Sequence, residues 1–170
     1  MTDADHAIGP ADAPVTLTMY GNYECLHCRR AYPAVEALRT EFGTRLRVVH
    51  RHYARAADFP HAELAAEAAE SAAAQGRFWE MHGALSLHAV FLDEPALLAE
   101  AERLGLDIER VVDDLESRRY HGLVRRQSMA AFESGVTSTP TFFINGNLFP
   151  AAYDLAAFST AVGTAVRDAG

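Results

Sequence analysis

The sequence predicts an α/β fold with an inserted all-helical subdomain, and three observations support this prediction. Residues 14–55 show a strand pattern, a helix pattern and a second strand pattern. Residues 56–134 are rich in alanine and charged residues and poor in strand formers, which favours a block of helices. Residues 135–170 return to two short strand patterns and a final helix. We therefore expect the order βαβ, helical insertion, ββα in a chain of 170 residues.

The first part is expected to form a parallel βαβ unit. Residues 15–21 (VTLTMYG) are β-branched and apolar enough for a buried strand, and residues 45–53 (RLRVVHRHY) alternate apolar and basic side chains. The helix between them is expected to begin near Glu24, to bend at Pro33 and to end at Gly43. A helix between two such strands implies a right-handed crossover and a parallel strand pair.

Capping signals divide the inserted segment into helices. Asp93 precedes a stretch with proline in its first turn, and Asp107 precedes the next apolar-periodic stretch, so both are expected N-caps. Gly76 ends an alanine-rich helix. The expected helices span residues 61–76, 77–88, 94–105, 108–119 and 120–135.

The C-terminal end of the chain has clear signals for secondary structure, and the N-terminal end has few. Residues 1–13 have little apolar content and are expected to form a flexible lead. Residues 141–144 are strand-like, and Asn145-Gly146 is a strong two-residue hairpin signal before a short returning strand at 148–149. Apolar residues then recur at helical spacing over residues 153–168.

Composition excludes several classes of function. The net charge is −8 and the pI is about 5.4, so nucleic acid is not an expected partner, because an acidic chain repels phosphate backbones. All 15 basic residues are arginine, which excludes Schiff-base chemistry and a phosphate-loop lysine in this chain. No apolar run reaches the length of a membrane span, and no secretory signal is visible. The expected location is cytoplasmic, or periplasmic or otherwise extracytoplasmic if a signal has been removed.

The only two cysteines, Cys25 and Cys28, form a Cys-x-x-Cys motif at a strand–helix junction. Inside a βαβ unit this motif indicates redox chemistry, and two residues three apart in a first helical turn lie close enough for a disulfide. Unpaired N–H groups and the helix dipole there lower the pKa of a thiol, and His27 adds a group that can carry positive charge. The negative charge of Glu24 raises the pKa of the thiol, and we expect the helix dipole and His27 to outweigh it.

Two other interpretations of the cysteine pair remain open. A zinc site needs four ligands, and Cys-x-x-Cys supplies two; His50 and His52, which share one face of a strand, could complete it. We favour it less because no second compact ligand pair stands at a familiar spacing, so we assign no metal ligand and no cofactor. The cysteines could instead be inert structural thiols, although buried structural cysteines rarely pair at a helix start.

A second landmark is TSTPTFFINGNLF at residues 137–149. Together with Cys-x-x-Cys after the first strand, its Thr139-Pro140 dipeptide before a later strand resembles the thioredoxin fold. The helical block between these motifs resembles the DsbA-like branch of the disulfide oxidoreductases. Also similar to that branch are GPADAPVTL (9–17), RHYARAADFPHAELAAEAAESAAAQGRFWEMH (51–82) and SGVTSTPTFFINGN (134–147). The resemblance extends from about residue 9 to residue 168.

This resemblance implies a set of site residues. Cys25 would be the exposed nucleophile and Cys28 the buried resolving cysteine. The Thr139-Pro140 bond is expected to be cis, and the Thr139 backbone to pair with an extended substrate peptide beside the cysteines. Tyr23 flanks the site and is a further candidate for the substrate groove. The candidate catalytic residues are therefore Cys25, Cys28 and His27, and the candidate substrate-binding residues are Leu26, Thr139, Pro140 and Tyr23.

Two departures from the family pattern bear on the mechanism. Leu26 follows the first cysteine, where the family often has proline. Many thioredoxins carry a buried acid on the strand entering the site, and the best matching position here is Met19, which argues against rapid reduction by the thioredoxin route. His27 matches the dipeptide of oxidising members, and a stabilised Cys25 thiolate makes the disulfide a stronger oxidant.

The predicted function is thiol–disulfide exchange with protein or peptide thiols through a mixed disulfide, with the oxidase direction slightly favoured. A redox recycling partner or glutathione would exchange electrons with the cysteine pair. One alternative is a glutathione-dependent reductase or isomerase acting on a small molecule with the same fold. Another is a non-catalytic metal- or protein-binding module, for which bound zinc or copper(I) would be the sign.

Overall fold

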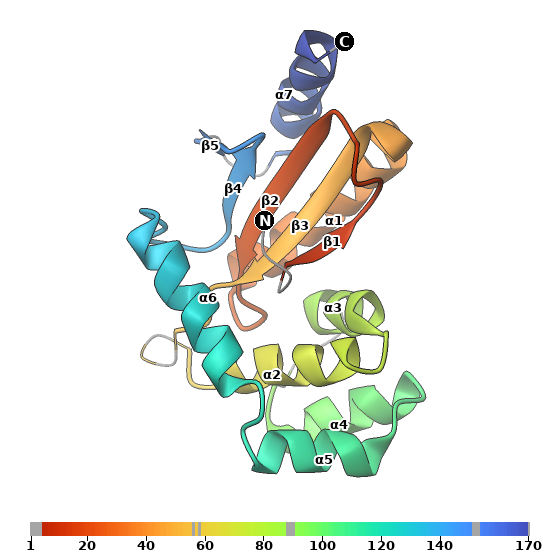
Figure 1. Cartoon of the computed structure of the whole chain (residues 1–170), viewed down its shortest axis with the longest axis vertical. Coiled ribbons are helices and arrows are strands. Elements are labelled where there is room, and N and C mark those ends of the chain that lie inside the picture. Colours follow the sequence, from red (N-terminus) through yellow and green to blue (C-terminus); the bar gives the residue numbers. More distant parts are fainter. Residues whose placement is uncertain (1–4, 56, 58, 88–90, 151–153, 170) are drawn as a thin grey trace.

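The computed structural model describes residues 5–55, 57, 59–87, 91–150 and 154–169, which form a sheet flanked by helices and a separate group of helices (Figure 1). The sheet has five strands in the order β1-β3-β2-β4-β5. The strands are β1 (His6–Ile8), β2 (Val15–Gly21), β3 (Leu46–His52), β4 (Thr141–Ile144) and β5 (Asn147–Phe149). The helices are α1 (Leu26–Phe42), α2 (Ala62–Ala73), α3 (Phe78–Leu87), α4 (Glu94–Arg103), α5 (Ile108–Glu116), α6 (His121–Glu133) and α7 (Leu155–Asp168).

The predicted βαβ unit is confirmed. Strands β2 and β3 pair in parallel, with Val15 opposite Leu46 and Gly21 opposite His52. Helix α1 connects them, and it begins two residues later than expected because Cys25 is its N-cap. Gly43 ends the helix with φ of 54°, a left-handed conformation that favours glycine.

The interpretation of residues 1–13 as a flexible lead is wrong for residues 6–8. These form β1, which pairs antiparallel with β3 and places His6 opposite His50. The imidazole of His6 also hydrogen-bonds Glu70 on α2, 2.8 Å away. Such a short edge strand is stabilised by the strand and helix that it contacts, and no local pattern in the sequence reveals either partner.

The helical insertion is built around α2, which Figure 1 shows crossing the centre of the lower part of the molecule. Alanines at 65, 68, 69 and 72 are fully buried and let neighbouring helices approach closely. The predicted N-caps are confirmed, since Asp93 accepts a hydrogen bond from Ala96 N and Asp107 accepts one from Arg110 N. The expected end of the second helix, residue 88, lies outside the described residues.

The predicted hairpin turn near the C-terminus is confirmed. Asn145 and Gly146 both have positive φ, 48° and 79°, as the predicted hairpin turn between β4 and β5 requires. Asp154 caps α7 by accepting a hydrogen bond from Ala157 N. The expected helix start at residue 153 lies outside the described residues. Helices α2 to α6 fall within residues 56–134, and we keep the three-part division at 14–55, 56–134 and 135–170 as a proposal.

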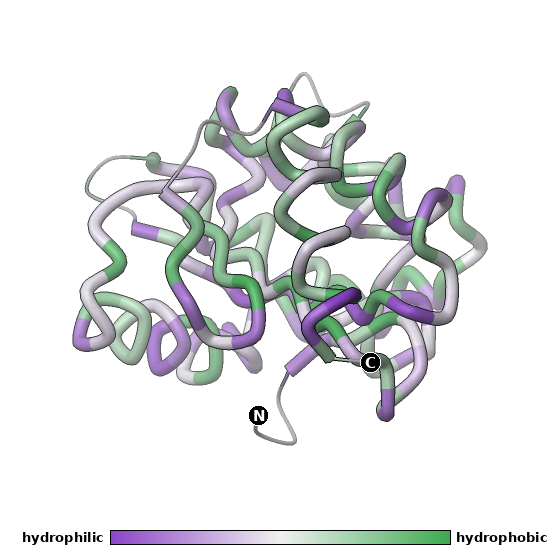
Figure 2. The backbone as a smooth tube through the Cα atoms, turned by 90° about the horizontal axis from the view of Figure 1, so that it is seen from above, coloured by the Kyte–Doolittle hydropathy of each residue, from purple (hydrophilic) through white to green (hydrophobic). Residues whose placement is uncertain are grey.

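The two faces of the sheet are covered by different helices. On one face, the apolar side chains of β2 and β3 pack against α1 and α7, and both cysteines belong to this cluster. On the other face, Tyr20 and Phe143 pack near Ala131 of α6. Figure 2 shows hydrophobic and hydrophilic stretches alternating along the helices. Among the described residues, no helix has the length and apolar character needed to cross a membrane.

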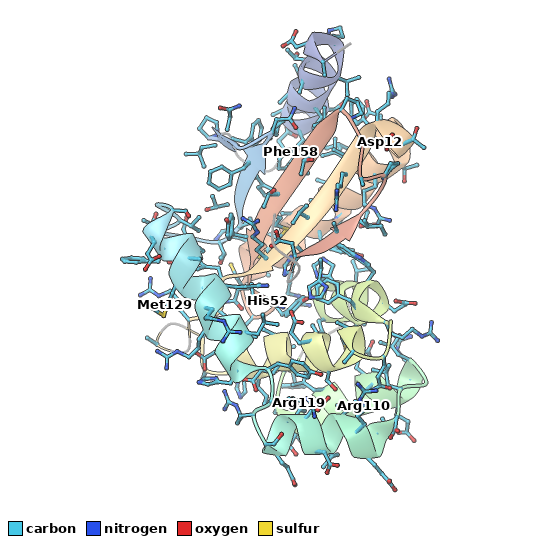
Figure 3. The ribbon with its side chains drawn as sticks, in the orientation of Figure 1. Asp12, His52, Arg110, Arg119, Met129 and Phe158 are labelled. Carbon is cyan, nitrogen blue, oxygen red and sulfur yellow. The ribbon has the colours of Figure 1, made fainter. Side chains whose placement is uncertain are left out.

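Phe158 of α7, labelled in Figure 3, lies in the core beside the sheet. It is 0% exposed, and its ring centroid lies 4.7 Å from those of both Phe142 and Phe149. Replacing Phe158 with alanine is expected to lower the free energy of unfolding by about 3–5 kcal/mol, because it leaves a cavity among these rings. Urea denaturation measures the loss. The control is Leu155→Ala on the same helix, where the side chain is 42% exposed and a change within about 0.5 kcal/mol is expected. Equal losses in the two variants would contradict this account.

Candidate active site

The turn from β2 into α1 brings the two cysteines together, and Asn22 organises this turn. The backbone N–H of Cys25 donates to the Asn22 carbonyl at 3.2 Å, and the N–H of Glu24 donates to the Asn22 side-chain oxygen at 2.9 Å. The N–H of Asn22 donates in turn to Cys28 Sγ at 3.4 Å. No role was assigned to Asn22 from the sequence. Its role depends on contacts that a strand-break signal does not specify.

The Thr139-Pro140 loop lies against the cysteine pair, as expected. The Thr139-Pro140 peptide bond is cis, which confirms the expectation drawn from the family resemblance. The thiol of Cys25 donates to the carbonyl oxygen of Thr139 at 3.3 Å, although the two residues are 114 positions apart. The fold therefore joins the two motifs that the sequence singled out.

The two thiols have opposite electrostatic environments. The pKa of Cys25 falls from 9.0 to about 5, chiefly because the Cys28 thiol hydrogen-bonds its thiolate. Burial opposes this shift, while the Thr139 side chain and the backbone N–H groups of Cys28 and His27 reinforce it. Burial raises the pKa of Cys28 far above its ordinary value, and the neighbouring Cys25 thiolate raises it further. These opposite shifts favour the thiolate form at Cys25 and the protonated form at Cys28.

The expectation that Cys25 is exposed is wrong as stated. Cys25 is 4% exposed and Cys28 is 5% exposed, and both are free thiols. The helix start and the Thr139 loop cover Cys25, so exposed area does not distinguish the two residues. Cys25 does line a cavity of about 330 Å³, whereas Cys28 is not among the residues that line it. Access to Cys25 is therefore through this cavity.

The cavity beside Cys25 continues toward α6. Its lining includes Thr139, Tyr53 and Arg55, and the last two also border a larger hollow of about 610 Å³. Met129 and Phe132 of α6 line that hollow with side chains 57% and 63% exposed. Figure 3 labels Met129 on the outer side of α6. The remaining residues that line the smaller cavity are Asn22, His27, Phe59, Thr137 and Ser138.

Glu24 and Met19 are the acidic and apolar neighbours of the site. The Glu24 carboxylate accepts a hydrogen bond from the backbone N–H of His61 at 2.8 Å and lies 3.2 Å from the His61 ring. Met19 is 5% exposed and belongs to the same apolar cluster as the cysteines. The strand entering the site thus presents a thioether where many thioredoxins present an acid.

Two candidate residues differ in how the structure places them. Leu26 is 53% exposed beside the cysteine pair, where a bound peptide can reach it. Tyr23 is 4% exposed and packs into the core of the helical insertion. Its hydroxyl lies 3.0 Å from Nδ1 of His82, so the ring points away from the cavity beside Cys25. Tyr23 lines a separate cavity of about 280 Å³ together with Glu24 and Arg29, and its substrate contact stays a prediction.

The zinc site considered for the cysteines does not form among the described residues. The group of three or more histidine, cysteine or acidic ligand atoms within 4.8 Å of one another consists of His6, His52 and Glu70. It contains neither cysteine. His50 and His52 are buried beneath the helical insertion, at 2% and 1% exposure.

The hydrogen bond between the thiols can be tested by substitution at Cys28. Cys28→Ala removes the donor, so the pKa of Cys25 is expected to rise from about 5 toward 9.0. Cys28→Ser keeps a hydroxyl donor, so the pKa of Cys25 in this variant should be lower than in Cys28→Ala by about one unit or more. The rate of alkylation by iodoacetamide follows the thiolate, so in wild type it should rise through about pH 5 and then level off. If the alkylation rates of Cys28→Ala and Cys28→Ser had the same pH dependence, the hydrogen bond from residue 28 would not be the cause of the low Cys25 pKa.

Comparisons with known proteins agree with this geometry. A family model described as thioredoxin matches residues 1–163. The chain is similar to a thioredoxin-like oxidoreductase from Silicibacter pomeroyi DSS-3, with 28% identity, a TM-score of 0.85, and coverage of 98% of this chain and 94% of that one. It is also similar to a variant of alpha-DsbA1 from Wolbachia pipientis, with 16% identity, a TM-score of 0.86, and coverage of 99% and 94%. This last likeness concerns the fold, and it confirms the predicted DsbA-like architecture.

The curated relatives are longer proteins. The chain is 44% identical over 167 residues to a Na(+)/H(+) antiporter, NhaA 3, of Salinispora tropica, covering 98% of this chain and 26% of the relative. The chain thus spans about a quarter of the length of the curated relatives it matches. The match of the family model over residues 1–163 and the fold agree that the chain belongs to the thioredoxin family.

Proposed function

We propose that the chain is a thiol–disulfide oxidoreductase that exchanges disulfides with protein or peptide thiols through Cys25 and Cys28. The observation that carries this proposal is the division between the two sulfurs at one helix start. Cys25 has a pKa of about 5 and lines a cavity, while burial keeps Cys28 protonated. A low-pKa thiolate is both a nucleophile at neutral pH and a good leaving group.

In the oxidising direction, a substrate thiolate attacks Cys25 Sγ of the Cys25–Cys28 disulfide. A bond forms between the substrate sulfur and Cys25, the Cys25–Cys28 bond breaks, and Cys28 leaves with the electron pair and takes up a proton. A second substrate thiolate then attacks the first substrate sulfur and releases Cys25 as a thiolate. The substrate loses two electrons to the cysteine pair, and a recycling partner or glutathione removes them.

Stabilisation of the Cys25 thiolate favours the dithiol form and therefore makes the disulfide more oxidising. We propose that His27 adds to this effect, since its backbone N–H already lowers the pKa of Cys25 and its side chain lies at the rim of the cavity. Met19 offers no carboxylate to deprotonate Cys28, which also disfavours the reducing direction. The oxidase direction is the one that these residues support.

The substrate is proposed to be an extended peptide. It would pass Thr139 and Pro140, whose loop contacts Cys25, and meet the exposed side chain of Leu26. The hollow along α6, with Met129 and Phe132 at its surface, continues the cavity and gives apolar side chains of the substrate a place to bind. The glutathione-dependent alternative needs a deep apolar pocket enclosed by the insertion, whereas among the described residues that line this cavity only Phe59 belongs to the insertion.

The relatives named as Na(+)/H(+) antiporters are about four times as long as the matched segment. We do not extend the antiporter activity to this chain, because the thioredoxin family model accounts for residues 1–163. We propose that the chain corresponds to a redox-active part of such proteins.

The division of roles between the cysteines can be tested by trapping. Cys28→Ser protein mixed with a disulfide-bonded peptide should accumulate a stable mixed disulfide at Cys25, because no second thiol is present to resolve it. Intact mass spectrometry identifies the adduct. Cys25→Ser is the matched control and should form little adduct, since burial keeps Cys28 protonated. Equal or greater adduct on Cys28 would overturn the assignment.

The direction of electron flow can be tested by equilibrating the cysteine pair against glutathione buffers. A potential near or above about −150 mV is expected, which suits a dithiol oxidase in an oxidising, extracytoplasmic compartment. His27→Ala should lower this potential. A value near or below about −250 mV would instead indicate a reductase suited to the cytoplasm and would contradict the role given to His27.

A further inference from the structure

A cluster of histidines lies between the sheet and the helical insertion. His50 and His52 alternate along β3 and so share one face, and β1 places His6 directly opposite His50. Glu70 of α2 and His82 of α3 cover this face from the insertion. Figure 3 labels His52 at the end of the sheet nearest α2. Three chain segments that are distant in sequence therefore meet around these side chains.

Three side chains of this cluster converge on one point. Nε2 of His6 lies 2.8 Å from Oε1 of Glu70, and Nε2 of His52 lies 2.9 Å from the same oxygen. All three ligand atoms lie within 4.8 Å of one another. The side chains of His52 and Glu70 are 1% and 5% exposed, whereas His6 is 19% exposed. The point is thus closed by protein on most sides and open to solvent beside His6.

The donor atoms at this point suit a cation, because two imidazole nitrogens and one carboxylate oxygen converge there. Within the described residues, neither ring nitrogen of His50 has a hydrogen-bond partner, and its ring lies 5.2 Å from that of His52.

We propose that His6, His52 and Glu70 form a binding site for a divalent transition-metal ion, with zinc as the expected occupant. Two imidazole nitrogens and one carboxylate oxygen are a ligand set that zinc uses, with a fourth position left for water. His50 is a candidate for that fourth position, since its ring lies 5.2 Å from that of His52 and its nitrogens have no hydrogen-bond partner among the described residues.

The geometry needs a small change to accept the ion. Ligand bonds to zinc are about 2.0–2.2 Å long, which separates the ligand atoms by roughly 3.4 Å in a tetrahedral site. The two imidazoles must therefore move away from Glu70 by about half an ångström each. The protons on the two Nε2 atoms must also shift to Nδ1 or leave to solvent, so zinc affinity should fall at acidic pH.

This proposal does not depend on the proposed redox function, because neither cysteine is a ligand. It also departs from the expectation that the chain has no metal ligand. The sequence hides the site, since His6 lies in a segment interpreted as a flexible lead and Glu70 lies in an alanine-rich helix. Only the pairing of β1 with β3 and the docking of α2 bring them together.

The test uses the disulfide-oxidised protein, in which the thiols cannot bind the ion. Titration with zinc chloride by calorimetry should give one ion per chain, and zinc should raise the melting temperature. His6→Ala should weaken the affinity at least about tenfold, because it removes a ligand from a short edge strand. The matched control is His61→Ala, a histidine with a 47% exposed ring outside the cluster, which should bind zinc like wild type.

X-ray absorption of the zinc-loaded protein provides an independent readout. The first shell should contain only nitrogen and oxygen, at about 2.0–2.2 Å, with no sulfur at about 2.3 Å. Glu70→Gln, which keeps the shape of the side chain, should lose affinity as His6→Ala does. No zinc bound by the oxidised wild type, or equal affinity in the His6→Ala and His61→Ala proteins, would overturn the proposal. Failure of the trapping experiment at Cys25 would leave this result unaffected.

Discussion

The tight turn from β2 into α1 is the constraint on which the redox site depends. Asn22 holds this turn through bonds to Cys25, Glu24 and Cys28, and it sets both sulfurs at the start of one helix. Both sulfurs belong to the apolar cluster beneath α1, and Cys25 also lines a cavity. The difference in pKa follows from the hydrogen bond that the Cys28 thiol gives Cys25 and from the burial of Cys28.

The helical insertion does more than extend the core. Alanine-rich α2 packs closely enough to bury Glu67, which pairs with Arg118 at 2.7 Å, and to bury Asp114, which accepts a hydrogen bond from Ser71. The same helix brings Glu70 against the sheet. The first two contacts join segments of the insertion to one another, and Glu70 ties the insertion to the sheet through His6 and His52. Removing one partner of such a pair would leave a buried polar group without a hydrogen bond, which is costly.

Much of this architecture follows from local signals. The β-branched apolar run at residues 15–21, the glycine at 43, the aspartate caps at 93 and 107 and the Asn-Gly turn each depend on nearby backbone geometry, so the sequence reveals them. β1 was missed because its stability comes from β3. The burial of Cys25 was missed because the Thr139 loop covers it from 114 positions away. The position of Tyr23 depends on His82, which belongs to the insertion.

The sequence by itself determined the order of the elements, the spacing of the cysteine pair and the presence of the Thr-Pro motif, because backbone propensities and short-range spacing act within a few residues. The tertiary structure decided how deeply the two sulfurs are buried, where the cavity lies and which histidines meet a carboxylate. Those properties depend on burial and on hydrogen bonds between distant segments, and such contacts exist only once the sheet and the helical insertion have packed together.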